Sequence, residues 1–476
     1  MASLKREFGL GIFYTAISKY MGMIVSLVVT GVLARLIVPE DFGVIAIATV
    51  IITFFGIFSD LGLAPAIVQN KTLTQRELSH LFSFSMYLSL FLSLAFFFSS
   101  GAIASFYDND KLVVICQLLS LNLFFVSLNV VPNGILYKGK EFRFIAMRTL
   151  VVQITGGVIS VIAALNGAGV YALLINPIYS SVALFLLSFA RHPLRFYLVP
   201  DINALKKVFS FSSYQFLFNL INYFSRNADK LLIGKYMNMN MLGFYEKSYR
   251  LMMLPLQNIT HVITPVMHPV LSEYQNDRPK LISSYEKVVR LVAFLGFPLS
   301  AVLFFTAAEL IMLFFGDAWA GSVASFEILA LSVGVQIISS TSGAIYQAAG
   351  DTRSLFVCGL FSSLLNVAGI AVGIFWLGSI EGVASCILVT FIINFVQCYL
   401  WMYYVTFKQS LASFVAQLWS PLLLGVLIAA GLWLVSAYCG GLHFLVSLGI
   451  KGFVSLALFA AYVYLTGEYT RFRNLK

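Results

Sequence analysis

Three basic side chains interrupt apolar stretches that are long enough to cross a membrane. Lys19 lies about 11 residues into the stretch 8–34, Arg226 lies near the end of 207–233, and Arg250 lies within 243–272. A charged side chain at the centre of a bilayer costs roughly 2.5–3.5 kcal/mol, so such residues are candidate functional sites. For residues near helix ends, the alternative is that the side chain snorkels into the headgroup layer. Their positive charge favours an anionic ligand, such as a phosphate group.

Polar residues recur at helical spacing in four of these stretches, so each set shares one helix face. The four sets are Thr15, Lys19, Ser26 and Thr30; Thr49, Thr53 and Asp60; Gln215, Asn219, Asn222, Arg226 and Asp229 or Lys230; and Glu246, Arg250, Gln257, His261, Thr264 and His268. Asp229 can also form an ion pair with Arg226 at i+3. Uncharged polar stripes also hold membrane helices together by hydrogen bonds, and that alternative stays open for the Asn, Gln and Thr positions.

The sequence contains no motif for metal, nucleotide or covalent chemistry. There is no G-x-x-x-x-G-K-[ST] loop, no H-E-x-x-H and no nucleophile elbow. No carboxylate or Cys completes a metal-ligand pattern around His261 and His268. All five cysteines fall within apolar stretches and are expected to be buried hydrophobic residues. We therefore predict no cofactor, no metal and no enzyme activity, and uphill transport would need an ion gradient, the membrane potential or removal of product.

The composition is that of a protein with many transmembrane helices. The chain has 476 residues, a mean hydropathy of +0.90, 60% hydrophobic residues and 11% charged residues, against about 25% charged residues in soluble domains. The N-terminus lacks a signal-peptide cleavage site, so we expect the first apolar stretch to remain as an anchor. The net charge of +10 is explained by basic loops facing anionic lipid, without a nucleic-acid partner.

The apolar stretches predict an all-α integral membrane protein of about fourteen transmembrane helices. We place them near 8–34, 43–68, 78–105, 112–136, 145–165, 169–190, 207–233, 243–272, 286–315, 322–347, 355–377, 381–406, 415–438 and 442–467. Of the 30 Lys and Arg residues, 21 fall in segments on the side of the N-terminus and 3 on the other side. The positive-inside rule then predicts that both termini are cytoplasmic.

Three short segments repeat at similar offsets, which indicates two related halves. RLIVPEDFG (35–43) matches KYMNMNMLG (235–243), LYKGKEFR (136–143) matches YQAAGDTR (346–353) with Gly139 aligned to Gly350, and GVYA (169–172) matches GVAS (382–385). The repeats predict two six-helix lobes in a pseudo-two-fold arrangement, residues 1–206 and 207–408, with two additional helices and a tail in 409–476. Parallel halves around a midplane site are a transporter architecture.

Four segments resemble a known family. VLARLIVPEDFGVIAIATVI (32–51), FSDLGLAPAIVQNK (58–71), LYKGKEFRFIAMRT (136–149) and AGDTRSLF (349–356) are similar to the polysaccharide transporters of the multidrug/oligosaccharidyl-lipid/polysaccharide flippase superfamily. Within it, O-antigen-type flippases and colanic-acid-type exporters are the most similar. The resemblance covers essentially the whole chain.

The resemblance implies a bacterial inner-membrane protein that moves undecaprenyl-pyrophosphate-linked oligosaccharide to the periplasmic leaflet for O-antigen, capsule or exopolysaccharide synthesis. By helix position it assigns diphosphate or acidic-sugar contact to Lys19, Arg226 and Arg250, and sugar contact to Asn219, Asn222 and Gln257. It assigns Asp60 or Asp229 to gating or ion coupling. The implied partners are membrane lipid and the lipid-linked oligosaccharide, with a polysaccharide polymerase and a chain-length regulator as candidates.

Other function classes are distinguished by features of the same sequence. A cation-coupled drug or small-solute exporter is expected to have a carboxylate-lined cavity, and the basic stripes argue against it. A membrane polymerase would have a large periplasmic loop and an acyltransferase a His/Asp-bearing segment, and neither is visible. A scaffold without transport activity is the remaining alternative.

Overall fold

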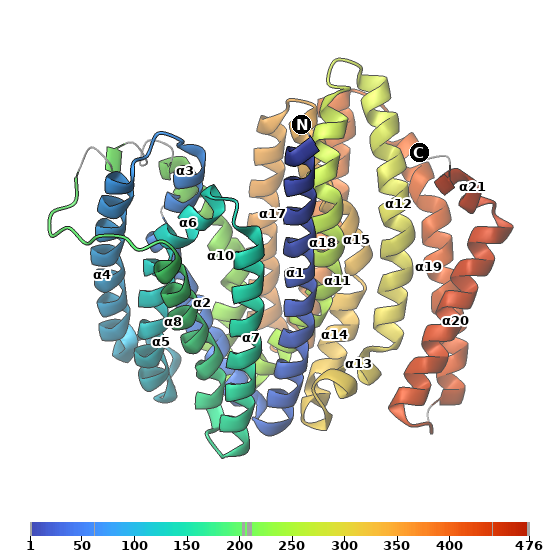
Figure 1. Ribbon diagram of the computed structural model, residues 1–476. Coiled ribbons are helices and arrows are strands. Elements are labelled where there is room, and N and C mark those ends of the chain that lie inside the picture. Colours follow the sequence, from blue (N-terminus) through green and yellow to red (C-terminus); the bar gives the residue numbers. More distant parts are fainter. Residues whose placement is uncertain (1, 61, 202–204, 207–211, 440, 474–476) are drawn as a thin grey trace. The chain divides into compact units, whose positions relative to one another are not determined.

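The computed structural model is helical throughout the part of the chain that it describes, with no β-strand there (Figure 1). It describes residues 2–60, 62–201, 205–206, 212–439 and 441–473. These residues form two compact units, Met1–Gly243 and Phe244–Lys476. The repeat predicts a lobe boundary after residue 206, whereas the boundary between the two compact units lies after Gly243. The difference arises because α10 packs against α2. The lobe boundaries therefore remain a prediction.

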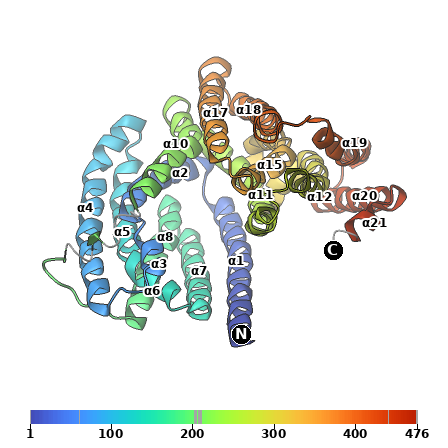
Figure 2. The ribbon, with the colours of Figure 1, turned by 90° about the horizontal axis from the view of Figure 1, so that it is seen from above.

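The first unit contains nine helices that carry most of the predicted site residues. Within the described residues they are α1 (Ala2–Leu36), α2 (Pro39–Asp60), α3 (Leu63–Gln69), α4 (Gln75–Tyr107), α5 (Lys111–Leu128), α6 (Val130–Lys138), α7 (Phe142–Leu165), α8 (Ala172–Arg191) and α10 (Ser212–Tyr236). A short 3-10 turn, Gly169–Tyr171, precedes α8. Helices α1 and α7 lie side by side in both views (Figures 1 and 2).

The second unit begins inside the next helix. Its described helices are α11 (Met239–Ser272), α12 (Arg278–Phe305), α13 (Ala307–Phe314), α14 (Val323–Ala330), α15 (Val333–Ser339), α16 (Ser342–Ala348), α17 (Thr352–Val372), α18 (Ile380–Trp401), α19 (Ala412–Cys439), α20 (Phe444–Leu465) and α21 (Glu468–Arg473). A 3-10 turn (Asp317–Ser322) precedes α14, and π-helical turns end α17 (Gly373–Leu377) and α18 (Met402–Phe407).

The helices confirm a protein that crosses the membrane many times. Among the described residues, 11 helices are long and apolar enough to span a bilayer, or 12 if the bent pair 317–330 and 333–348 is one span. Helices α10 and α11 have 25 and 34 residues but are not among these apolar helices. These are two of the helices with predicted polar stripes, so the predicted count of fourteen depends on whether both cross the membrane.

Equivalent turns in the two repeats have the same hydrogen bonds. After α6, the N–H groups of 139, 140 and 141 donate to the carbonyls of 135, 137 and 136. After α16, those of 349, 350 and 351 donate to 345, 347 and 346. The offset here is therefore 210, and the partner of Gly350 is Lys140 rather than Gly139. Both have a positive φ, 73° and 56°, which is the conformation that the turn requires.

The first repeated segment forms a close helix crossing within the first unit. Helix α2 begins at Pro39 and α11 begins at Met239, an offset of 200. A Cβ on Gly43 would overlap the carbonyl oxygen of Met239, and a Cβ on Gly243 would overlap that of Pro39. Each repeat therefore supplies a glycine against the helix start of the other, and small residues of this kind let membrane helices approach closely.

Buried ion pairs attach the last two apolar helices to the second unit. Glu309 on α13 binds Lys451 on α20, and Ser447 Oγ also donates to this carboxylate at 2.6 Å. Glu309 is 8% exposed and Lys451 6%. A second set of contacts involves Arg290 of α12, which bonds to Glu468 of α21 and to Gln417 of α19. The added helices are thus held by polar contacts as well as by apolar packing.

We predict that Gly43→Ala or Gly243→Ala destabilises the protein by about 1–3 kcal/mol, because the added methyl group overpacks the crossing. Thermal unfolding of the purified protein in detergent measures this effect. Gly56→Ala, on the same helix α2 with no heavy atom within 4 Å of the added Cβ, is the matched control and should be nearly neutral. Equal loss in Gly56→Ala and Gly43→Ala would contradict the close crossing.

We also predict that Glu309→Gln lowers the free energy of unfolding by about 3–5 kcal/mol, since it leaves the buried Lys451 ammonium without its counter-charge. The double variant Glu309→Leu/Lys451→Met should lose much less, because both charges are removed together. Unfolding midpoints of the single and double variants are the measurement. A single variant that is no less stable than the double variant would show that this pair is not buried as described.

Candidate functional site

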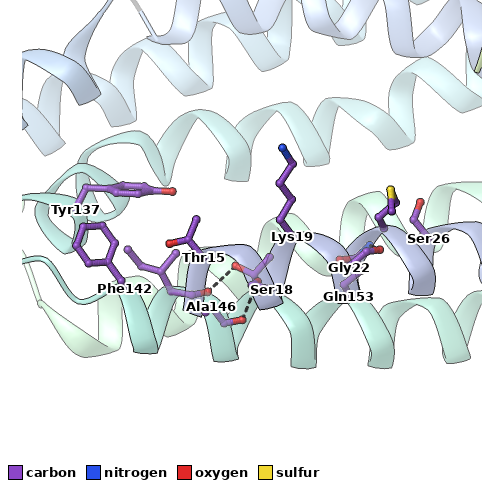
Figure 3. Close-up of a pocket in the computed structure, with 12 residues that line it drawn as sticks. Thr15, Ser18, Lys19, Gly22, Ser26, Tyr137, Phe142, Ala146 and Gln153 are labelled. Carbon is purple, nitrogen blue, oxygen red and sulfur yellow. Dashed lines mark hydrogen bonds between the residues drawn. The ribbon is translucent and has the colours of Figure 1, made fainter. Parts of the chain in front are cut away.

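A polar groove of about 430 Å³ lies in the first unit between α1, the end of α6 and α7 (Figure 3). Its lining residues are Thr15, Ser18, Lys19, Gly22, Met23, Ser26, Tyr137, Phe142, Ile145, Ala146, Thr149 and Gln153. Ligand sites for small molecules have volumes of roughly 300–1,000 Å³, so the groove has the size of such a site.

Small residues on α1 create the groove by letting α7 approach. Gly11, Ser18 and Gly22 recur at intervals of seven and four residues and therefore share one helix face. Ser18 Oγ donates to the Ala146 carbonyl at 3.3 Å, and Gln153 Nε2 donates to the Gly22 carbonyl at 2.8 Å. The polar stripe of α1 lies beside this contact face, at the mouth of the groove.

Lys19 is the one charged side chain among the described residues that line the groove. It is exposed, and the described part of the chain offers it neither a hydrogen bond nor an ion pair. Figure 3 shows its side chain extending from α1 on the side away from α7. With one cation and no carboxylate on its wall, the groove favours an anionic group.

The turn between α6 and α7 is held by an ion-pair cluster that positions Tyr137 and Phe142. Glu141 accepts from Arg191 Nε at 2.8 Å and contacts His192, both at the end of α8. Burial by itself would raise the pKa of the Glu141 carboxyl, but the hydrogen bonds from Arg191 and His192 hold that pKa below its usual value. The aromatic rings of Tyr137 and Phe142 lie 6.5 Å apart, at the end of the groove beside this turn.

Arg226 and Asp229 are the other predicted site residues of the first unit whose side chains the structure describes, and they do not line this groove. Arg226 is exposed on α10, whereas Asp229 is buried with 4% of its surface accessible. The Asp229 carboxylate accepts the N–H of Lys230 at 2.8 Å. The side chains of Asp60, Asn219 and Asn222 lie outside the described part of the structure, so their predicted roles remain predictions.

Arg250 and Gln257 lie on α11 in the second unit. The Arg250 side chain is half-buried and that of Gln257 is exposed. In the same unit, the neighbouring Lys247 is 2% exposed and lies 5.6 Å and 5.4 Å from the ring centres of Phe315 and Trp319. This contact shows a cation stabilised within the fold by aromatic rings.

Sequence reasoning missed the α6–α7 wall of the groove. Thr149 and Gln153 are one helical turn apart in a helix that also carries Arg143, Arg148 and Thr155, so their spacing is only a weak polar stripe. Tyr137 lies in a segment that the sequence marks as a repeated turn and as part of the family resemblance. These residues line the same groove as Lys19 only because α7 is the helix that packs against α1. No group of three or more metal-binding side chains occurs in the described residues.

We predict that Glu141→Gln destabilises the protein at neutral pH by about 0.2–1 kcal/mol, since Arg191 is partly exposed to solvent. Because the folded pKa is lowered, the carboxylate contributes stability above its unfolded pKa of about 4.3. This contribution is lost as the pH falls through the lowered pKa of Glu141. Thermal unfolding of both proteins across this range should therefore show their difference shrinking in acid.

The exposed Glu273 provides the control for this experiment, because Glu273→Gln should not change stability at neutral pH. If the difference between the native protein and Glu141→Gln stayed constant into acid, the carboxylate would not be what holds the turn.

Comparisons with known proteins agree with this architecture. Residues 32–324 match the family model described as polysaccharide biosynthesis protein. The lipopolysaccharide biosynthesis protein WzxC of Escherichia coli K12 is 25% identical over 434 residues, which is 89% of this chain and 86% of that protein. The teichuronic acid biosynthesis protein TuaB of Bacillus subtilis is 22% identical over 431 residues, 89% of this chain and 88% of that protein.

A solved structure of the lipid II flippase MurJ, in an inward closed conformation, has a similar fold. The TM-score is 0.72 at 16% sequence identity, over 95% of this chain and 99% of that chain. The family match covers more than half of the sequence, and the helices are those of a multi-pass membrane protein. The chain therefore belongs to the polysaccharide biosynthesis protein family of membrane proteins.

Proposed function

We propose that this protein is a flippase that moves undecaprenyl-pyrophosphate-linked oligosaccharide units from the cytoplasmic to the periplasmic leaflet by alternating access. Both termini would be cytoplasmic, in the inner membrane of a bacterium. The product would serve the synthesis of a surface polysaccharide, with a polymerase and a chain-length regulator acting after translocation. The protein would make and break no covalent bond.

The observation that carries this proposal is the groove around Lys19. It combines one ammonium group, which has no partner among the described residues, with several hydroxyl and amide groups. A diphosphate needs a cation, and sugars need hydrogen-bonding groups, so the headgroup of a lipid-linked oligosaccharide requires both. A cationic drug would instead favour a carboxylate on the wall, and the described lining contains none.

The family and the fold support the same proposal. The relatives are named for the synthesis of lipopolysaccharide and teichuronic acid, and the MurJ protein of similar fold is named as a flippase for lipid II. The headgroup would bind in the groove while the polyprenyl chain stays in the bilayer, which avoids moving the apolar chain through a polar cavity.

Arg226 and Arg250 remain candidates for further contacts with the diphosphate or with acidic sugars. Asn219, Asn222 and Gln257 remain candidates for sugar contact, and Asp60 and Asp229 for gating or ion coupling.

Deletion of the gene in the source organism tests the proposal. We expect loss of surface polysaccharide and accumulation of lipid-linked repeat units on the cytoplasmic leaflet, both restored by the native gene. Lys19→Ala should restore little polymer. Loss of a charge-assisted hydrogen bond costs about 1.5–3 kcal/mol, which is roughly 10- to 100-fold in affinity.

Lys71→Ala, which changes an exposed lysine in the turn after α3, is the matched control and should restore polymer fully. All variants are compared at equal abundance in the membrane. Normal polymer from the Lys19→Ala/Arg226→Ala double variant would defeat the role of cavity cations. Unchanged polymer in the deletion strain, with no second flippase gene present, would favour a small-solute exporter instead.

A further inference from the structure

The wall of the groove presents mainly hydrogen-bond acceptors. Three of its side chains donate their hydrogen to a main-chain carbonyl: Thr15 Oγ1 to Gly11 (2.8 Å), Thr149 Oγ1 to Ile145 (2.7 Å) and Gln153 Nε2 to Gly22 (2.8 Å). A hydroxyl has one donor hydrogen and two acceptor lone pairs, and the amide oxygen of Gln153 is an acceptor. After these internal bonds, the oxygens of all three side chains remain as acceptors, and the Gln153 amide keeps one hydrogen as a donor.

The ammonium and phenol donors of the groove are at different positions from these acceptors. Lys19 supplies the ammonium group, one helical turn or about 6 Å along α1 from Thr15. Tyr137 supplies a hydroxyl at the end of the groove beside the α6–α7 turn, where Figure 3 shows its ring extending toward Thr15. Phe142 lies beside it, so this end also offers an aromatic surface. Aromatic faces carry negative charge density and pack well against C–H groups.

These two regions suit two parts of one ligand. A diphosphate carries acceptors only and requires the cation at Lys19. A sugar ring carries several hydroxyl donors around an apolar C–H face, and so requires acceptors together with an aromatic surface. The geometry points to a division of the groove. The diphosphate binds at Lys19, and the first sugars lie against Thr149, Gln153, Tyr137 and Phe142.

We infer that this α6–α7 wall determines which oligosaccharide the protein accepts. This inference rests on the proposed function, since it concerns the headgroup of the same lipid. Lys19 interacts with the diphosphate, which is the same for every lipid-linked oligosaccharide. The wall interacts with the sugars, which differ between polysaccharides. A groove of about 430 Å³ has room for the first sugars of a headgroup.

Binding of two lipids to the purified protein in nanodiscs tests the inference. One probe is undecaprenyl diphosphate without sugars, and the other is the lipid-linked repeat unit isolated from the deletion strain. Native mass spectrometry measures both affinities. The double variant Thr149→Val/Gln153→Leu should bind the repeat unit about tenfold more weakly, with its affinity for undecaprenyl diphosphate unchanged. Lys19→Ala should weaken the binding of both lipids.

Thr155→Val is the matched control, because Thr155 lies on α7 outside the groove, and it should bind both lipids normally. Tyr137→Phe keeps the aromatic ring and removes one hydroxyl, so it should selectively weaken binding of the repeat unit even if the double variant does not fold. Equal loss of both lipids in the wall variants, or no loss of either, would overturn the inference. Failure of the native protein to bind either lipid would instead defeat the proposed function.

Discussion

The groove depends on the close contact between α1 and α7. Gly22 lies against Gln153, and a Cβ on Gly157 would lie 2.5 Å from Val29, so the two helices meet through positions that lack a side chain on one partner. In a bilayer, apolar side chains gain little by leaving lipid, so helices associate by close packing and by hydrogen bonds between them. Both occur here, and they place the polar stripe of α1 beside the polar residues of α7.

The described cations differ in whether the protein itself supplies their partners. Lys451 is bound by Glu309, and Arg148 of α7 donates to Ser188 and Asn133, so both cations have partners within the protein. Lys19 has no such partner among the described residues. An unpaired charge within a membrane is costly, which is why the proposed function assigns the missing partner of Lys19 to an anionic ligand.

The internal repeat has a structural counterpart in the turns. The starts of α2 and α11, and the turns before α7 and α17, repeat the same geometry at offsets of 200 and 210. The glycines at the first pair are in reciprocal contact with the opposite helix start. The likeness between these segments therefore lies at turns, where the backbone conformation restricts the residue type.

The helical class, the approximate bounds of the long apolar helices and the position of Lys19 on a polar helix face follow from the sequence alone. These follow from local rules, since twenty apolar residues span a bilayer and residues three or four apart share a face. Two features are seen only in the folded structure. Helix α7 packs beside that face of α1, and Glu309 forms an ion pair with Lys451, 142 residues further on. Periodicity specifies which side of a helix is polar, but not which other helix it meets. The same holds for the polar stripes of α10 and α11. A stripe that faces a cavity and a stripe that faces a neighbouring helix have the same periodicity in the sequence.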